Sequence, residues 1–233
     1  MLSFDFGDKN SYTDFGILIS KRPSIPSAKR RVDFYNIPGR SGTLKYDENT
    51  YEDITITLEC SLRSTDLLSE IDKIKYWLFS SAESELIFSF QKDKKYIAQV
   101  VNSIDIKQVY KYLGYFPIIF SCHPFKYHSD DNILIPYASP FTFKNTGTLP
   151  SEPIITIYGS GLIKLKVNDE VIELHDVDGI IELDSELMEC YSPTELRNGS
   201  MYGEFPLFRT GDNKISWEGT VSNIYIKPNF RSL

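Results

Sequence analysis

The sequence predicts a mainly β protein of two domains, in which the first domain carries a single helix. Tyr, Phe and Trp make up 14% of the 233 residues, a composition that favours half-buried pleated surfaces. Alternation of apolar and polar residues recurs along the chain, whereas a clear apolar stripe with helical spacing occurs once. The charge is also divided unequally, because residues 1–126 hold 17 basic and 16 acidic side chains and residues 127–233 hold 8 and 16. This difference indicates two domains with different surfaces.

The first predicted domain, residues 1–123, is built mainly of alternating segments. Phe4–Phe6 and Val32–Ile37 alternate, and the clearest strand is at residues 51–62. On that strand one face carries Ile54, Ile56, Leu58 and Cys60, and the other face carries Asp53, Thr55, Thr57 and Glu59. The segment therefore predicts a strand with one face in a core and one in water.

One helix is predicted at about residues 65–79. Ser64-Thr65-Asp66 provides an N-cap signal with an acidic side chain in the first turn. The apolar residues that follow have helical spacing: Leu67, Ile71, Ile74 and Leu78. We expect this stripe to pack on a sheet.

Two connections interrupt the predicted strands of this domain. Residues 38–50 begin with Pro38-Gly39-Arg40-Ser41-Gly42 and predict a loop that is long for a hairpin connection. The polar run Gln91–Lys95 predicts the turn of a hairpin between two apolar strands.

A proline-rich segment separates the two predicted domains. Residues 124–153 contain five prolines, which exclude long regular elements, and we interpret them as a linker or crossover. Residues 154–233 carry short apolar segments joined by polar turns, which predicts an antiparallel β-sandwich to which the linker can contribute strands.

No catalytic, metal or cofactor motif is present in the sequence. It contains no G-x-S-x-G, H-E-x-x-H or phosphate-loop motif, and its three cysteines and three histidines lack metal-ligand spacing. We therefore expect no enzyme activity, catalytic residue, metal or cofactor.

Charge and hydropathy also restrict the partners and the location. The net charge of −7 argues against a sequence-specific nucleic-acid binder. No apolar run is long enough to span a membrane, and the N-terminus lacks the features of a secretory signal, so we expect a chain that is soluble in the cytoplasm where it is made.

Two groups of residues are candidates for binding. The basic cluster Lys29, Arg30 and Arg31 is interpreted as a solvated strand end or a contact between subunits, in preference to a polyanion site. Aromatic residues near the C-terminus could stack on sugar rings, although aromatic residues of a sandwich more often belong to its core. Tyr202 and Trp217 are the candidates for this role.

The sequence resembles the distal tail proteins of long-tailed bacteriophages with non-contractile tails, because several short motifs occur in the same order. In the first domain the resemblance rests on Phe4-x-Phe6 and on Ile37-Pro38-Gly39-Arg40-Ser41-Gly42-x-Leu44, in which Ser41 replaces an expected acidic residue. In the second half it rests on a series of further motifs: Asn145-x-Gly147, Pro153 to Gly159, Val167-Asn168, Gly179 to Asp184, Gly203-x-Phe205-Pro206, Gly211-x-Asn213-x-Ile215 and Ile226-x-Pro228.

The resemblance implies a fold and a structural role. It implies an N-terminal domain that assembles into a homohexameric ring, which in isolation can pair back to back, and a galectin-like C-terminal sandwich. It further implies a hub at the tail tip of the virion that joins the tail tube to tape measure, baseplate and other tail-associated proteins and lets DNA pass. Such a hub would assemble in the cytoplasm of the host bacterium, and Lys29, Arg30, Arg31 and Arg40 are then candidate interface residues.

An alternative remains open from the sequence. The C-terminal sandwich could be a carbohydrate-binding module that recognises glycans of the host cell wall, with Tyr202 and Trp217 as stacking residues. A fold alone does not confer sugar binding, because function depends on the site.

Overall fold

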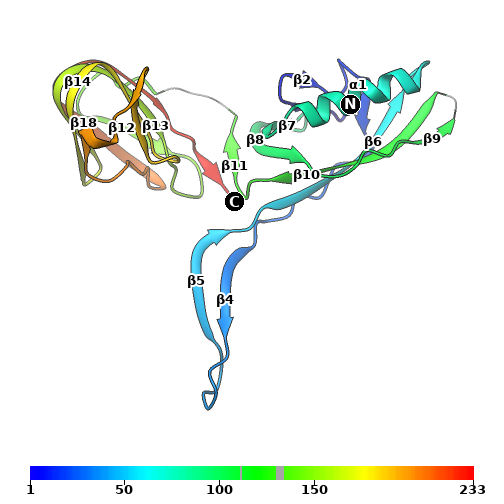
Figure 1. Cartoon of the computed structure of the whole chain (residues 1–233), viewed down its shortest axis with the longest axis horizontal. Helices are drawn as coiled ribbons and strands as arrows, with labels where there is room; N and C mark the ends of the chain where they lie inside the picture. Colours follow the sequence, from blue (N-terminus) through cyan, green and yellow to red (C-terminus); the bar gives the residue numbers. More distant parts are fainter. Residues whose placement is uncertain (111, 130–133) are drawn as a thin grey trace. The chain divides into compact units, whose positions relative to one another are not determined.

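The computed structural model describes residues 1–110, 112–129 and 134–233, and it divides into two compact units (Figure 1). The N-terminal unit comprises residues 1–129 with Leu233, and the C-terminal unit comprises residues 130–232. Of the predicted linker, residues 130–133 lie outside the described residues, while Lys126–His128 and Phe141–Asn145 are strands. The prediction of a mainly β fold with one α-helix is confirmed over the described residues.

The N-terminal unit is an antiparallel sheet covered by one helix. The sheet has the strand order β2-β1-β7-β8-β10-β6-β3, with β9 paired to β10 and β11 to β8, and β4 and β5 form a separate pair. The elements in chain order are β1 Phe4–Phe6, β2 Lys9–Asn10, β3 Ile17–Ile19, β4 Arg30–Tyr35, β5 Leu44–Tyr51, β6 Ile54–Arg63, α1 Leu67–Ser80, β7 Ser84–Phe88, β8 Gln91–Val100, β9 Lys107–Tyr110, β10 Leu113–Cys122 and β11 Lys126–His128.

Helix α1 closes the core of this unit over the sheet. The Asp66 side chain accepts a hydrogen bond from the Ser69 backbone N–H at 3.3 Å, as an N-cap does, so the predicted start is confirmed. Trp77 is buried, its ring stacks on Phe4 and Phe15, and its Nε1–H donates to the Phe6 carbonyl at 3.1 Å. The alternation on β6 is also confirmed, because its apolar positions are buried and its polar ones face outward.

The C-terminal unit is one antiparallel sheet that curls over a single core. The strand order is β12-β18-β13-β14-β15-β16, with β17 paired to β14. The elements in chain order are β12 Phe141–Asn145, β13 Ile154–Val167, β14 Glu170–Asp184, β15 Glu189–Ser192, β16 Glu195–Leu196, the 3₁₀ turn η1 Asn198–Ser200, β17 Met201–Tyr202, β18 Gly211–Lys227 and β19 Arg231–Ser232.

Three long strands bend to make both sides of this sandwich. Strand β13 pairs with β14 and β18 over most of its length, and its register shifts between Gly161 and Ile163. Ile155 and Ile157 before the shift, and Leu165 after it, all enter the same buried cluster. A Cβ on Gly159 would lie 2.3 Å from the Thr220 carbonyl oxygen, so only glycine permits this close approach of β13 to β18.

Three local predictions were wrong. Residues 44–50 are not a loop but belong to β5, and Gln91–Lys95 is not a turn but the first half of β8, which follows a tight turn at Ser89-Phe90. Residues 170–184 form one long strand, where short segments joined by polar turns were predicted for residues 154–233. In the first two segments the polar residues suggested a break, although polar residues also form paired strands. In the third the break was suggested by Gly179, whereas a glycine within a long paired strand accommodates a bulge or bend.

Candidate functional site

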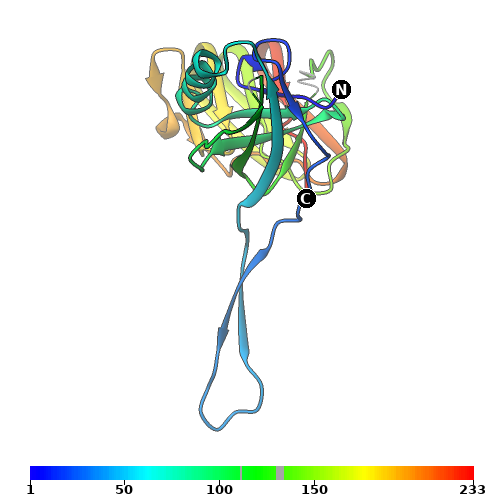
Figure 2. The ribbon, with the colours of Figure 1, turned by 90° about the vertical axis from the view of Figure 1, so that its right-hand side faces the viewer.

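The hairpin formed by β4 and β5 is the most exposed regular element of the N-terminal unit. Its two strands pair with each other and form a sheet of their own. Every residue from 33 to 50 is exposed to solvent. Figures 1 and 2 show the hairpin running away from the sheet of its unit. A two-stranded hairpin is at best marginally stable alone in water, so this arrangement indicates a surface that a partner covers.

Large apolar side chains are spread along this exposed hairpin. Phe34 is 62% exposed and Tyr46 is 60% exposed. The strand register places Phe34 opposite Lys45 and Tyr46 opposite Asp33, so apolar residues occur on both faces of the ribbon. The others are Tyr35, Ile37 and Leu44. Such a group is typical of a protein–protein contact.

Two of the predicted interface cations are used inside the hairpin. The Lys29 ammonium lies 2.9 Å from a Glu52 carboxylate oxygen, and the Arg30 guanidinium lies 2.8 Å from Asp47 and 2.6 Å from the Asn49 side-chain oxygen. Hydrogen bonds from the Asn49 N–H and from Arg30 lower the pKa of the Asp47 carboxyl, which keeps it ionised. Lys29 and Arg30 therefore stabilise the base of the hairpin.

The other two predicted interface cations have no side-chain partner among the described residues. Arg31 lies on β4, and Arg40 lies in the turn between the strands, where its backbone N–H donates to the Ile37 carbonyl at 3.1 Å. In this turn Gly39 and Gly42 both have φ of +82°, a conformation that favours glycine. Free charges and exposed aromatic rings thus occur on the same element.

Tyr202 and Trp217, the predicted glycan-stacking residues, lie on opposite faces of the curled sheet. Tyr202 pairs with Glu173, points outward and is 59% exposed. Trp217 pairs with the buried Leu165 and packs against the core. The structure therefore does not bring these two rings together.

Neither a metal-binding cluster nor an ionised cysteine thiol occurs among the described residues. Within them, no group of three or more His, Cys, Asp and Glu side chains could hold a metal ion. Burial raises the pKa of the Cys60 and Cys122 thiols to about 12 and that of Cys190 to about 11, so all three are protonated at neutral pH. No helix among the described residues is long and apolar enough to cross a membrane.

Comparison with known proteins places the N-terminal unit in a family. Residues 8–122 match the family model of the phage tail protein RIFT-related domain, a segment that includes the exposed hairpin and helix α1. The unit is a phage tail domain. The sequence matches none of the curated proteins.

The fold of the whole chain is also that of a solved structure. It is similar to the Dit (gp 19.1) protein of phage SPP1, with a TM-score of 0.74 and 12% identity, over 97% of this chain and 98% of that one. That protein is described as a paradigm of the hub adsorption apparatus of phages infecting Gram-positive bacteria. The family match and this fold confirm the predicted resemblance to the distal tail proteins. The chain thus carries a phage tail domain in its N-terminal unit, and its overall fold is that of a Dit protein.

Proposed function

We propose that six copies of this chain form a closed ring at the tail tip, which joins the tail tube to the tape measure and baseplate proteins and lets DNA pass. The observation that carries this proposal is the exposed hairpin, whose aromatic and basic side chains have no cover within the chain. Cyclic association is heterologous, so the hairpin of one subunit would contact a different surface on its neighbour. Assembly would take place in the host cytoplasm, before the ring joins the tail.

The two exposed apolar faces of the hairpin favour repeated self-association over a single contact. The apolar residues lie on both faces of the ribbon, so covering one face leaves the other exposed. A ring in which each hairpin lies between two neighbouring surfaces covers both faces. The near-neutral charge of residues 1–126 imposes little repulsion on such an assembly, while residues 127–233 carry the excess of acidic groups.

The first test is the mass of the native particle, by light scattering or native mass spectrometry, with negative-stain images of the same peak. Six copies of 26.8 kDa give about 161 kDa, and two rings back to back give about 322 kDa. We expect a ring with a central hole at one of these masses. A monomer or dimer at micromolar concentration, unchanged by addition of the tail tube protein, would contradict the proposal.

Charge reversal tests the role of the hairpin in this ring. Arg31→Glu together with Arg40→Glu should lower the mass to that of smaller species, because both side chains are exposed and unpaired among the described residues. Lys92→Glu is the matched control, since it reverses an exposed charge of the same unit away from the hairpin. Arg30 is left unchanged because its substitution would break the internal pair with Asp47. A ring that forms equally well with both hairpin reversals would show that these residues are not at the interface.

A further inference from the structure

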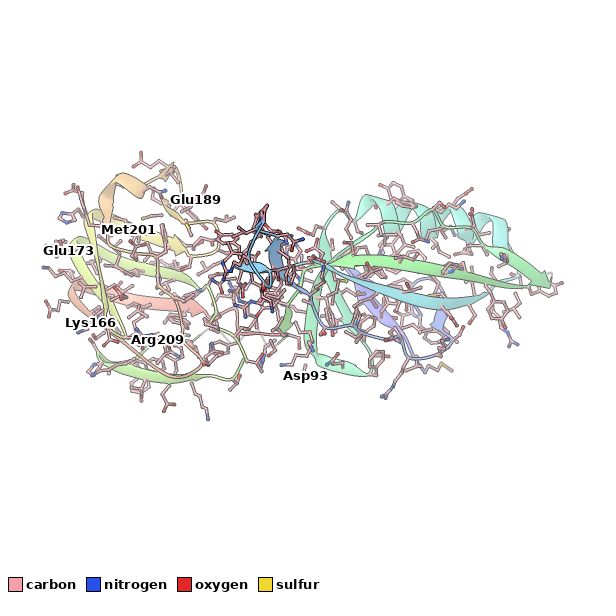
Figure 3. All side chains as sticks on the ribbon, turned by 90° about the horizontal axis from the view of Figure 1, so that it is seen from below. Asp93, Lys166, Glu173, Glu189, Met201 and Arg209 are labelled. Atoms are coloured by element: carbon pink, nitrogen blue, oxygen red, sulfur yellow. The ribbon has the colours of Figure 1, made fainter. Side chains whose placement is uncertain are left out.

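A row of polar side chains crosses the outer face of the C-terminal unit at the bent strands. The register places Glu218 of β18 beside Lys164 of β13, Lys164 beside Glu173 of β14, and Glu173 beside Tyr202 of β17. The residues on either side of Lys164 and of Glu173 along their strands are buried, so these two side chains face away from the core. His175 lies two positions after Glu173 on β14 and shares this face. Figure 3 shows Glu173 at the margin of this unit.

Direct contacts hold these side chains in place. The Lys164 ammonium lies 2.7 Å from one Glu173 carboxylate oxygen, and the His175 Nε2 lies 3.4 Å from the other. The His175 and Tyr202 rings meet edge to face with centroids 4.8 Å apart. Hydrogen bonding to Lys164 and to His175 lowers the pKa of Glu173, and the same bond to Glu173 raises the pKa of Lys164, so both stay charged at neutral pH. The cluster is therefore preorganised without a ligand.

The cluster keeps unused hydrogen-bonding capacity at its surface. An ammonium group has three N–H donors, of which Lys164 gives one to Glu173 within the described residues. A carboxylate offers about four acceptor sites, and an imidazole has a second ring nitrogen. Beside them Tyr202 leaves 59% of its surface exposed, while the preceding Met201 packs against the core.

The charges of the cluster define the class of ligand. The row holds one ammonium, that of Lys164, and two carboxylates, those of Glu173 and Glu218. Two carboxylates against one ammonium disfavour a polyanion at this row. An aromatic ring next to several fixed donors and acceptors matches a sugar ring, which has C–H groups on one side and hydroxyl groups around its edge.

We propose that Lys164, Glu173, His175 and Tyr202 form a binding site for a neutral sugar unit of a polysaccharide. The Tyr202 ring stacks against the sugar, and Lys164, Glu173 and His175 hydrogen-bond to its hydroxyl groups. Trp217 takes no part, because it lies on the core face of the sheet. The site is separate from the hairpin and does not depend on ring formation.

The test uses the full chain and an array of neutral oligosaccharides, followed by calorimetric titration with the strongest binder on the array. Tyr202→Ala should weaken binding by about fivefold or more, and Glu173→Gln should weaken it similarly, because each removes a contact worth about 1 kcal/mol or more. Tyr202→Phe keeps the ring and should retain most of the affinity.

The matched control is Tyr137→Ala, which removes another exposed tyrosine, 89% exposed, from the same unit. It should bind like the unaltered protein, and all variants should keep the same melting temperature and the same particle mass. The proposal is overturned if no neutral oligosaccharide binds, if only anionic polymers bind, or if Tyr202→Ala and Tyr137→Ala bind equally. The particle mass of these variants reports on the hub separately, so failure of the sugar site and failure of the hub are distinguishable.

Discussion

Single residues show which charges and glycines serve the fold and which remain available for partners. In the hairpin, Arg30 is held by Asp47 and Asn49, whereas the neighbouring Arg31 projects without a partner among the described residues. In the C-terminal unit, Gly159 is required for space, because an added Cβ would lie 2.7 Å from the Ile163 side chain as well as 2.3 Å from Thr220. Substitution of a residue that serves the fold, such as Gly159, should lower stability, whereas substitution of an unpartnered surface residue, such as Arg31, should not.

Gly159→Ala should destabilise the C-terminal unit. The added methyl group forces β13 and β18 apart, and overpacking of this kind typically costs about 1–3 kcal/mol. Gly199→Ala is the matched control, since a Cβ at Gly199 would meet nothing within 4 Å. Chemical denaturation of both variants measures the difference in the free energy of unfolding. Equal stabilities would show that the strands do not approach this closely in solution.

At the scale of elements, the helix and the hairpin differ in where their stability comes from. Helix α1 has a local cap at Asp66 and a buried apolar side that includes Leu67, Ile74 and Trp77. The hairpin has its own ladder and the ion pairs at its base, but residues 33–50 bury nothing within the chain. The helix is therefore complete in one subunit, whereas the hairpin is completed by its neighbours in the proposed ring.

Phe34→Ser combined with Tyr46→Ser should leave the stability of the single subunit nearly unchanged. Substitutions of exposed side chains usually change the free energy of unfolding by less than about 0.5 kcal/mol. The same variant should fail to form the ring, because it removes aromatic rings from both faces of the ribbon. Melting temperature and native mass, measured on one sample, separate these effects. A ring of unchanged mass would exclude the aromatic residues from the contact.

Elements with local sequence signals were predicted correctly, whereas elements without such signals were missed. The helix could be predicted because its cap and its apolar stripe are local. Strand β5 was missed because its sequence, rich in Lys, Asp, Glu and Asn, has no apolar face. The row from Lys164 to Tyr202 depends on strand register between distant segments, so the sequence could suggest Tyr202 but not its neighbours.

At the scale of the whole molecule, the chain contains two separate apolar clusters. One cluster includes Ile56, Trp77 and Phe120 from the N-terminal unit, and the other includes Ile157, Leu165 and Ile226 from the C-terminal unit. We propose that the units correspond to two domains with separate functions, assembly in the first and sugar binding in the second.

Two unfolding transitions are therefore expected in calorimetry of the full chain. Ile56→Ala should lower one melting temperature and Ile157→Ala the other, because each removes a fully buried side chain at a cost of about 2–5 kcal/mol from a different core. A single transition that both substitutions shift by the same amount would show that the two units unfold as one.

The continuity of β13, β14 and β18 through the bends of the sandwich has a mechanical consequence. Each of these strands contributes hydrogen bonds along its length before and after its bend. A pull that tries to open the sandwich must therefore break hydrogen bonds of the β13–β14 and β13–β18 ladders on both sides of the bend. In the proposed hub, such a domain would resist being pulled open.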